Sequence, residues 1–79
     1  MRLSDEFIGE LELLNLFNLN NSLAGIKIHH GADPKRIASA KRLFEKNMIT
    51  LEDGGYLTPL GIEAAGHTQA LILMLQPVK

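Results

Sequence analysis

The chain has 79 residues, 46% of them apolar, with a net charge of −1 and no cysteine. This length predicts one domain over residues 1–79, with a marginal core, since a chain of this size buries only roughly 60% of its unfolded surface. The missing cysteines exclude disulfides and thiolate chemistry. No window approaches the ~18 uninterrupted apolar residues of a membrane span, and the acidic start is unlike a signal peptide. We therefore expect a soluble cytoplasmic protein.

The small net charge hides an uneven distribution. Residues 27–46 hold six of the eight Lys and Arg residues against two acids, which gives +4, whereas the remainder holds two against seven, which gives −5. Such polarity predicts a basic face that meets an anionic partner and an acidic remainder that faces away. The alternative is an ordinary solvated lysine face.

The first helix is predicted to begin at Ser4, which caps it, with acids in the first turn. Its apolar residues spread over more than one face, which is typical of a central helix or of one shared with a partner subunit. The main buried stripe is Phe7, Leu11 and Leu14, flanked by Ile8 and Phe17, and Leu13, Leu16 and Leu19 fall elsewhere.

Residues 22–30 allow two interpretations. Ser22 can cap a short helix with Leu23 and Ile26 facing inward, ended by Gly31 in a left-handed conformation. The alternation from Ile26 to His29 fits a short strand equally. The helix is the favoured interpretation.

Asp33 and Pro34 mark the start of a helix that extends to Asn47, because Asp caps free N–H groups and Pro suits the first helical position. Helical spacing separates its residues into two faces. Ile37, Ala40, Phe44 and Met48 form the face predicted to be buried, and Lys35, Ser39, Arg42 and Lys46 form a cationic face opposite.

A tight hairpin and a last helix follow. Two short strands, 48–51 and 56–58, flank a turn at 52–55 that contains two glycines, and Thr58-Pro59 repeats the helix-start signal. The last helix, Pro59 to Leu75, is expected to bury a face formed by Leu60, Ala64, Leu71 and Leu75. Its final turns, ALILMLQ, are apolar on all sides and need a cover, from the first helix or across a two-fold axis.

These stretches resemble the second half of a winged helix-turn-helix domain: a basic helix ending in LFEKNMIT, the hairpin DGGYLT, then TPLGIEAA. They are similar to bacterial transcription regulators of the multiple-antibiotic-resistance and phenolic-acid-repressor types. The whole chain also resembles a small, functionally uncharacterised bacterial family. The resemblance implies an α+β, mainly helical fold, a winged helix-turn-helix with a short two-stranded hairpin wing, in which residues 22–30 precede the turn.

The same resemblance implies that the helix 34–47 reads duplex DNA, as part of a small transcription regulator or accessory factor. It places six residues on or beside the exposed face: Lys35, Arg36, Ser39, Lys41, Arg42 and Lys46. Ser39 and Arg42 are expected to meet bases, and Lys35 and Lys46 the backbone. The acidic wing tip, Glu52-Asp53, is a departure from the pattern, because carboxylates repel phosphate.

The alternative function is a protein-interaction or dimerisation module on the same scaffold, without DNA binding. Either function is compatible with a homodimer that self-associates through the first and last helices. Phe44 is expected in the core, and Tyr56 is expected to support it rather than stack on bases.

We do not expect an enzyme, and we predict no metal, cofactor or small-molecule substrate. The groups that resemble a site are His29, His30, Asp33 and His67. On a helix, the adjacent histidines would point about 100° apart and could not share a ligand.

Overall fold

A computed structural model describes residues 2–21 and 23–78. Its elements, in chain order, are α1 (Asp5–Leu14), β1 (Ile26–Lys27), α2 (Pro34–Glu45), β2 (Ile49–Leu51), β3 (Gly54–Leu57) and α3 (Pro59–Met74). The fold is therefore α+β and mainly helical, as expected. The strands form one antiparallel sheet in the order β1-β3-β2, and β1 pairs Ile26 with Gly55 and Lys27 with Gly54.

The helix favoured for residues 22–30 is wrong for the part of this segment that the structure describes. Residues 23–30 contain no helix, and Ile26–Lys27 form β1, which is the strand alternative. The proposed cap at Ser22 lies outside the described residues. The strand can form because Gly54 has no side chain, so β1 can approach it closely. A Cβ on Gly54 would collide with the Ile26 carbonyl. As a result, the helix expected before the turn of a helix-turn-helix is not among the described elements.

Three side chains that cap helices act as the sequence predicted. Ser4 Oγ accepts from Phe7 N at 3.1 Å, and the Asp33 carboxylate accepts from Lys35 N at 2.9 Å. Thr58 Oγ1 accepts from Gly61 N at 3.0 Å and donates to the Asn47 carbonyl at 2.6 Å. Thr58 therefore ties the start of α3 to the end of α2.

The end of α2 turns the chain sharply into β2. Asn47 has a φ of 63°, Asn47 N donates to Phe44 O at 3.0 Å and Met48 N donates to Leu43 O at 2.9 Å. These two bonds make the Schellman motif, in which a left-handed residue satisfies the last free carbonyls of a helix. The hairpin is consequently placed directly beside the C-terminal end of α2.

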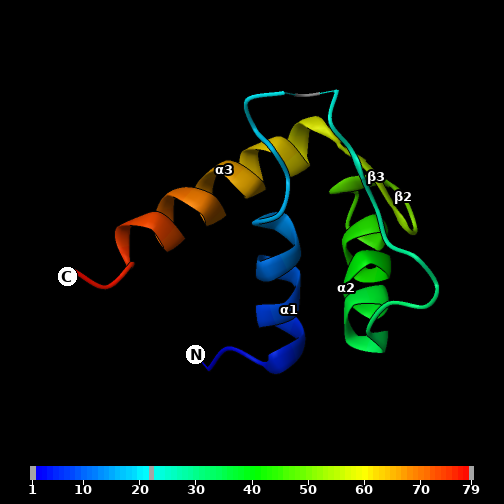
Figure 1. The fold of residues 1–79 in the computed structure, drawn as a ribbon, viewed down its shortest axis with the longest axis horizontal. Coiled ribbons are helices and arrows are strands. Elements are labelled where there is room, and N and C mark those ends of the chain that lie inside the picture. The colour runs from blue at the N-terminus through cyan, green and yellow to red at the C-terminus, as the bar shows by residue number, and fades with distance from the viewer. Residues whose placement is uncertain (1, 22, 79) are drawn as a thin grey trace.

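Figure 1 shows α1 and α2 side by side, with the sheet at one end of α2. The helix α3 starts from that sheet, crosses the C-terminal end of α1 and then diverges from α1 towards the C-terminus. The buried core lies where the three helices and the sheet meet, and consists of Leu13, Leu14, Phe17, Ala40, Leu43, Ile49 and Ala65. No described helix is long and apolar enough to cross a membrane.

The buried faces of α1 and α3 differ in part from those predicted. On α1, Leu14 is buried as predicted and Leu13 is fully buried beside it, whereas Phe7 is 37% exposed and Leu11 is only half-buried. On α3 the buried residues are Gly61, Ala65 and Thr68, while Leu60, Leu71 and Leu75 of the predicted face are exposed. A Cβ at Gly61 would overlap the Met48 carbonyl, so the small face of α3 is the one that fits.

Candidate functional site

Three of the six residues predicted to contact DNA lie in the contact between α1 and α2. Ser39 is only 2% exposed, and the side chain of Arg42 is 26% exposed. Lys46 keeps half of its side chain in solvent but pairs with α1. The predicted cationic face is therefore wrong, because its middle is turned towards α1.

Glu10 of α1 is the reason that these cations turn inward. Its side chain is 7% exposed, and its carboxylate accepts from Arg42 Nε at 3.0 Å and from Lys46 Nζ. Arg42 Nη2 also donates to the Glu6 carbonyl and to Ser39 Oγ, each at 3.1 Å. A buried carboxylate needs such partners, since an unpaired charge in the interior is costly.

A close approach of the two helices accompanies this network. A Cβ on Gly9 would lie 2.6 Å from Ser39 Oγ, so the absence of a side chain at Gly9 lets α2 present Ser39 to α1. Ser39 Oγ in turn donates to the Lys35 carbonyl at 2.9 Å. The buried face of α2 thus contains Ser39, Ala40 and Leu43.

This face lies between the two faces predicted from the sequence, about a quarter turn from each. Ala40 is buried as expected and Ile37 is half-buried, but Phe44 is 41% exposed rather than in the core. Phe44 occupies one flank of the buried face, and Arg42 and Lys46 occupy the other.

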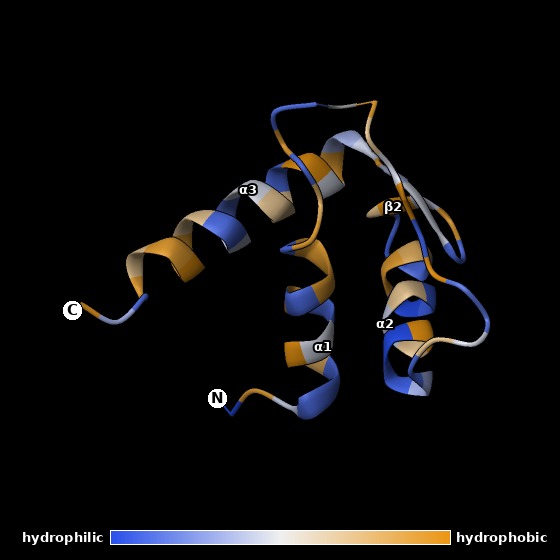
Figure 2. Cartoon of the chain, viewed as in Figure 1, coloured by the Kyte–Doolittle hydropathy of each residue, from blue (hydrophilic) through white to orange (hydrophobic). Residues whose placement is uncertain are grey.

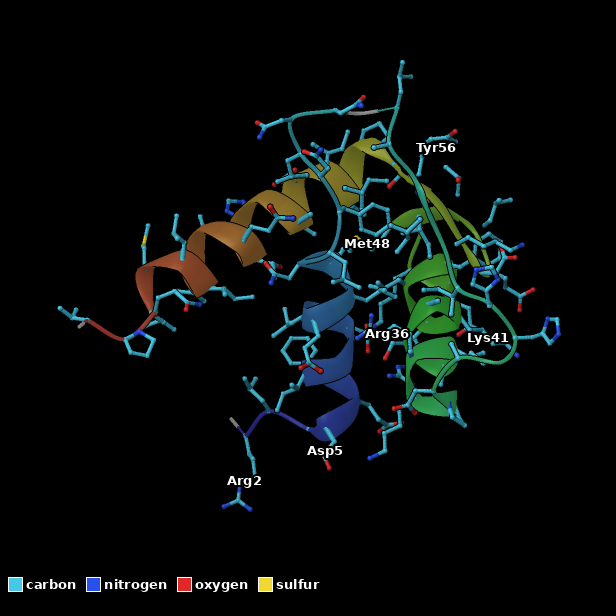
Figure 3. All side chains as sticks on the ribbon, in the orientation of Figure 1. Arg2, Asp5, Arg36, Lys41, Met48 and Tyr56 are labelled. Carbon is cyan, nitrogen blue, oxygen red and sulfur yellow. The ribbon has the colours of Figure 1, made fainter. Side chains whose placement is uncertain are left out.

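Lys35, Arg36 and Lys41 are the other predicted contacts, and no ion pair is seen for them within residues 2–21 and 23–78. Lys35 and Lys41 are exposed and Arg36 is half-buried. At 100° per residue, these three side chains leave α2 about 100–140° apart. Figure 3 shows Arg36 and Lys41 on opposite sides of α2. They do not form one stripe.

The acidic hairpin tip is partly neutralised by β1. Lys27 Nζ donates to the Asp53 carboxylate at 2.5 Å, and this hydrogen bond lowers the pKa of Asp53 below its ordinary value of 3.8. The Asp53 carbonyl also accepts from Ile28 N at 2.7 Å. Lys27 is therefore paired with the hairpin, and Glu52, which precedes Asp53, is exposed.

A groove of about 710 Å³ lies between the N-terminal halves of α1 and α2. Its α1 wall carries acids and its α2 wall carries cations, with Asp5, Glu6 and Glu12 facing Lys35, Arg36 and Arg42. Asp33, at the start of α2, also lines the groove, so the acids outnumber the cations by four to three and the groove is not suited to a polyanion. Within the described residues, no three histidines or acids gather to hold a metal ion, and His67 lies on the surface 3.9 Å from Glu63.

The most distinctive surface is at the end of α3. Leu71, Leu73, Met74 and Leu75 are 57–77% exposed, and we call these four residues the apolar end of α3. Figure 2 shows this end of the helix in the colours of hydrophobic residues, projecting away from α1. From Thr68 to Gln76 no side chain is ionisable. The sequence had indicated this surface through its all-round apolar composition.

Further exposed apolar residues lie at the start of the chain. Leu3 is 46% exposed, and Phe7 and Ile8 of α1 are 37% and 40% exposed. These residues are near the N-terminus, which lies on the same side of the molecule as the C-terminus in Figure 1. Apolar surface is thus available on both helices that the sequence had linked to self-association.

Comparison with known proteins gives a family without an assigned activity. The model of a family described as "Family of unknown function (DUF5669)" matches residues 1–76. No curated protein and no solved structure matches the chain.

Proposed function

The chain belongs to this family of unknown function, and we propose that it is a protein-interaction module that binds through the apolar end of α3. The observation that carries the proposal is the 57–77% exposure of Leu71, Leu73, Met74 and Leu75. A helix that is apolar on all sides is normally covered, and a contiguous exposed apolar patch marks an interaction site.

The positions of the predicted DNA-contacting residues favour this proposal over the reading of DNA by α2. Ser39 and Arg42, the residues expected to meet bases, are buried or paired with Glu10, and Lys46, which was expected to meet the DNA backbone, also pairs with Glu10. Sequence readout requires side chains that reach base edges in a groove. The exposed surface of α2 offers no such row.

A single-cysteine label tests the interaction surface, because the natural chain contains no cysteine. Leu73→Cys and Leu23→Cys would each carry a photo-reactive maleimide, since Leu73 and Leu23 are 74% and 82% exposed and differ in location. We expect protein cross-links from position 73, in the purified chain or in extract, and few from position 23. Equal cross-linking from both positions, or none from 73, would contradict the proposal.

Binding of duplex DNA stays a second candidate, favoured by the exposed Lys35 and Lys41 and by the +4 charge of residues 27–46. If only Lys35, Arg36 and Lys41 contact phosphates, the logarithm of the binding constant should fall with the logarithm of salt concentration with a slope no steeper than about −3. Titration of labelled duplex DNA at several salt concentrations measures this slope. A slope near zero, or no binding at low salt, removes this candidate.

A further inference from the structure

We propose that the partner of the apolar end of α3 is a second copy of this chain, joined by a two-fold axis, with the α3 of each protomer filling the open angle between α1 and α3 of the other. The inference rests on the proposed function, because it names the occupant of the same surface. Figure 1 shows this angle, which opens between the N-terminal end of α1 and the C-terminal end of α3.

The inward stripes of both helices continue beyond the core of one protomer. On α3, Ala65 and Thr68 are 0% and 8% exposed, Ile72 is half-buried and Leu75 is 73% exposed, although helical spacing places all four on one side. The stripe of α3 that packs against the core at Ala65 is therefore exposed to solvent over its last turn. Burial ends because α3 diverges from α1, not because the apolar pattern ends.

The helix α1 shows the same gradient in the opposite chain direction. Leu14 is 5% exposed and belongs to the core with Ala65, Leu11 is half-buried and Phe7 is 37% exposed. Their spacing of i, i+4 and i+7 places these three residues on one side of α1. Both helices therefore have apolar residues left over where they separate.

A second copy solves two requirements at once. The end of α3 is apolar all round, so it needs cover on its outer faces as well as on its inner face. In a two-fold arrangement, the α3 of one protomer lies in the angle between α1 and α3 of the partner, where its outer residues Leu73 and Met74 are covered. By symmetry, the partner's α3 fills the equivalent angle of the first protomer. A two-fold interface is self-complementary by construction.

Charge does not oppose this pairing. No ionisable side chain lies between Thr68 and Gln76, so two α3 ends can meet without bringing like charges together. Burial of polar atoms is also small, because this stretch contains only three polar side chains, Thr68, Gln69 and Gln76. Gln69 is already occupied, since it donates to the carbonyl of Leu14 in α1 and to the carbonyl of Phe17 just after this helix.

The available area matches that of a stable dimer. Seven apolar residues contribute, with exposures of 37–97%: Leu3, Phe7, Leu71, Leu73, Met74, Leu75 and Val78. At about 60–120 Å² for a fully buried side chain of this kind, they offer on the order of 410 Å² per protomer. Apolar atoms make up about 65% of a homodimer interface, so the total is roughly 1,300 Å², within the range of specific interfaces.

Sedimentation equilibrium of the purified chain tests the inference over protein concentrations from about 1 µM to 1 mM. We expect twice the chain mass at the upper end. Leu73→Glu should raise the dissociation constant by about a hundredfold or more, because the symmetry introduces the buried carboxylate twice. Leu23→Glu is the matched control, since Leu23 is equally exposed but lies before β1, and it should leave the dissociation constant unchanged.

A third variant tests the role of α1. Phe7→Glu should also weaken the dimer, because the partner's α3 would lie against Phe7, and circular dichroism of each variant confirms that the fold is retained. A Phe7→Glu variant that dimerises normally would overturn the proposed angle, and a natural chain that stays monomeric at every concentration would overturn the second copy as partner.

These failures can be told apart from failure of the proposed function. If the purified chain is monomeric but the label at position 73 cross-links to a different protein in extract, the interaction module stands and the second copy is wrong. If position 73 gives no cross-link in either setting and the chain is monomeric, both proposals fail.

Discussion

Glu10 on α1 and Arg42 on α2 are joined by a hydrogen bond of 3.0 Å between the Glu10 carboxylate and Arg42 Nε, and the Glu10 side chain is only 7% exposed. This one buried acid therefore determines that the cations of α2 beside it contact α1 rather than solvent. Lys46 binds the other carboxylate oxygen, so two cations that resemble a DNA-contacting row hold two helices together. A row of positive residues on a helix is therefore insufficient to indicate a nucleic-acid surface when an acid on the neighbouring helix lies within reach.

The first prediction concerns Arg42→Ala. This change removes the bonds to Glu10, to the Glu6 carbonyl and to Ser39 Oγ, and leaves the Glu10 carboxylate with Lys46 as its remaining partner. We expect a loss of about 1–3 kcal/mol in the free energy of unfolding, measured by urea denaturation, because hydrogen bonds to buried charges are stronger than average.

Lys41→Ala is the control for Arg42→Ala, since Lys41 is the preceding residue of α2 and is exposed. It should change the free energy of unfolding by less than about 0.5 kcal/mol. If Arg42→Ala is as mild as Lys41→Ala, the Glu10 network does not stabilise the contact between α1 and α2.

The second prediction compares the same substitution at two helical glycines. Gly9→Ala should lower the free energy of unfolding by about 1 kcal/mol net, because the new Cβ would lie 2.6 Å from the buried Ser39 Oγ, which outweighs the gain in helix propensity. Gly66→Ala should instead raise it by up to about 1 kcal/mol, because nothing lies within 4 Å of the added Cβ. Thermal and urea unfolding at one protein concentration measure both.

A double variant checks the cause of the Gly9 effect. Ser39→Ala removes the oxygen that the new methyl would meet, so Gly9→Ala with Ser39→Ala should be less destabilised than the sum of the two single changes. Strict additivity would show that the two positions are not in contact.

The sequence predicts the ends of the helices better than their faces. Ser4, Asp33 and Thr58 cap helices where their local pattern places them, because each cap depends only on residues two or three apart. The faces depend on which neighbour each helix meets. Helical spacing of apolar residues pointed to Phe44, whereas the contact is set by Gly9 and Ser39, two small residues distant in sequence whose close approach has no periodic signal.

Residues 22–30 show the same limit for the sheet. Ile26-Lys27 alternate in a way that fits a strand, but a two-residue strand is stable only beside a partner that comes more than twenty residues later. The partner residues Gly54 and Gly55 have φ values of 126° and 77°. The pattern of a hairpin turn predicts positive φ values at these glycines, but it does not indicate that a further strand pairs with them. The pairing is non-local, so local pattern leaves it open.

The third prediction uses the pH dependence of the contact between Lys27 and Asp53. The pKa of Asp53 lies below its ordinary value of 3.8 because Lys27 donates a hydrogen bond to the carboxylate. A lowered folded pKa means that the stability from this contact is complete above pH 3.8 and is lost as the pH falls through the lower folded value.

Carboxyl ¹³C chemical shifts followed through an acid titration measure this pKa directly. Lys27→Met should move the pKa of Asp53 up towards 3.8, whereas Lys41→Met, which removes an equal charge from α2, should leave it in place. Equal shifts in both variants would assign the effect to net charge rather than to the hydrogen bond.

The last prediction concerns Gln69, whose amide nitrogen donates to the carbonyls of Leu14 and Phe17 at 3.1 and 2.7 Å. The bond to Leu14 satisfies a carbonyl in the last turn of α1, where a helix leaves carbonyls without partners, and the bond to Phe17 satisfies a carbonyl just beyond this helix. Gln69→Glu has nearly the same shape but replaces the donor by a carboxylate, which repels both carbonyls and carries a negative charge to the negative end of the α1 dipole. We expect it to lower the free energy of unfolding by about 1–3 kcal/mol at neutral pH. Gln76→Glu makes the same change at the exposed end of α3, where the amide binds only its own helix at 3.3 Å, and it should cost less than about 0.5 kcal/mol in urea denaturation of both variants at a protein concentration low enough for the chain to be monomeric. Equal losses at the two positions would mean that Gln69 does not anchor α3 to α1.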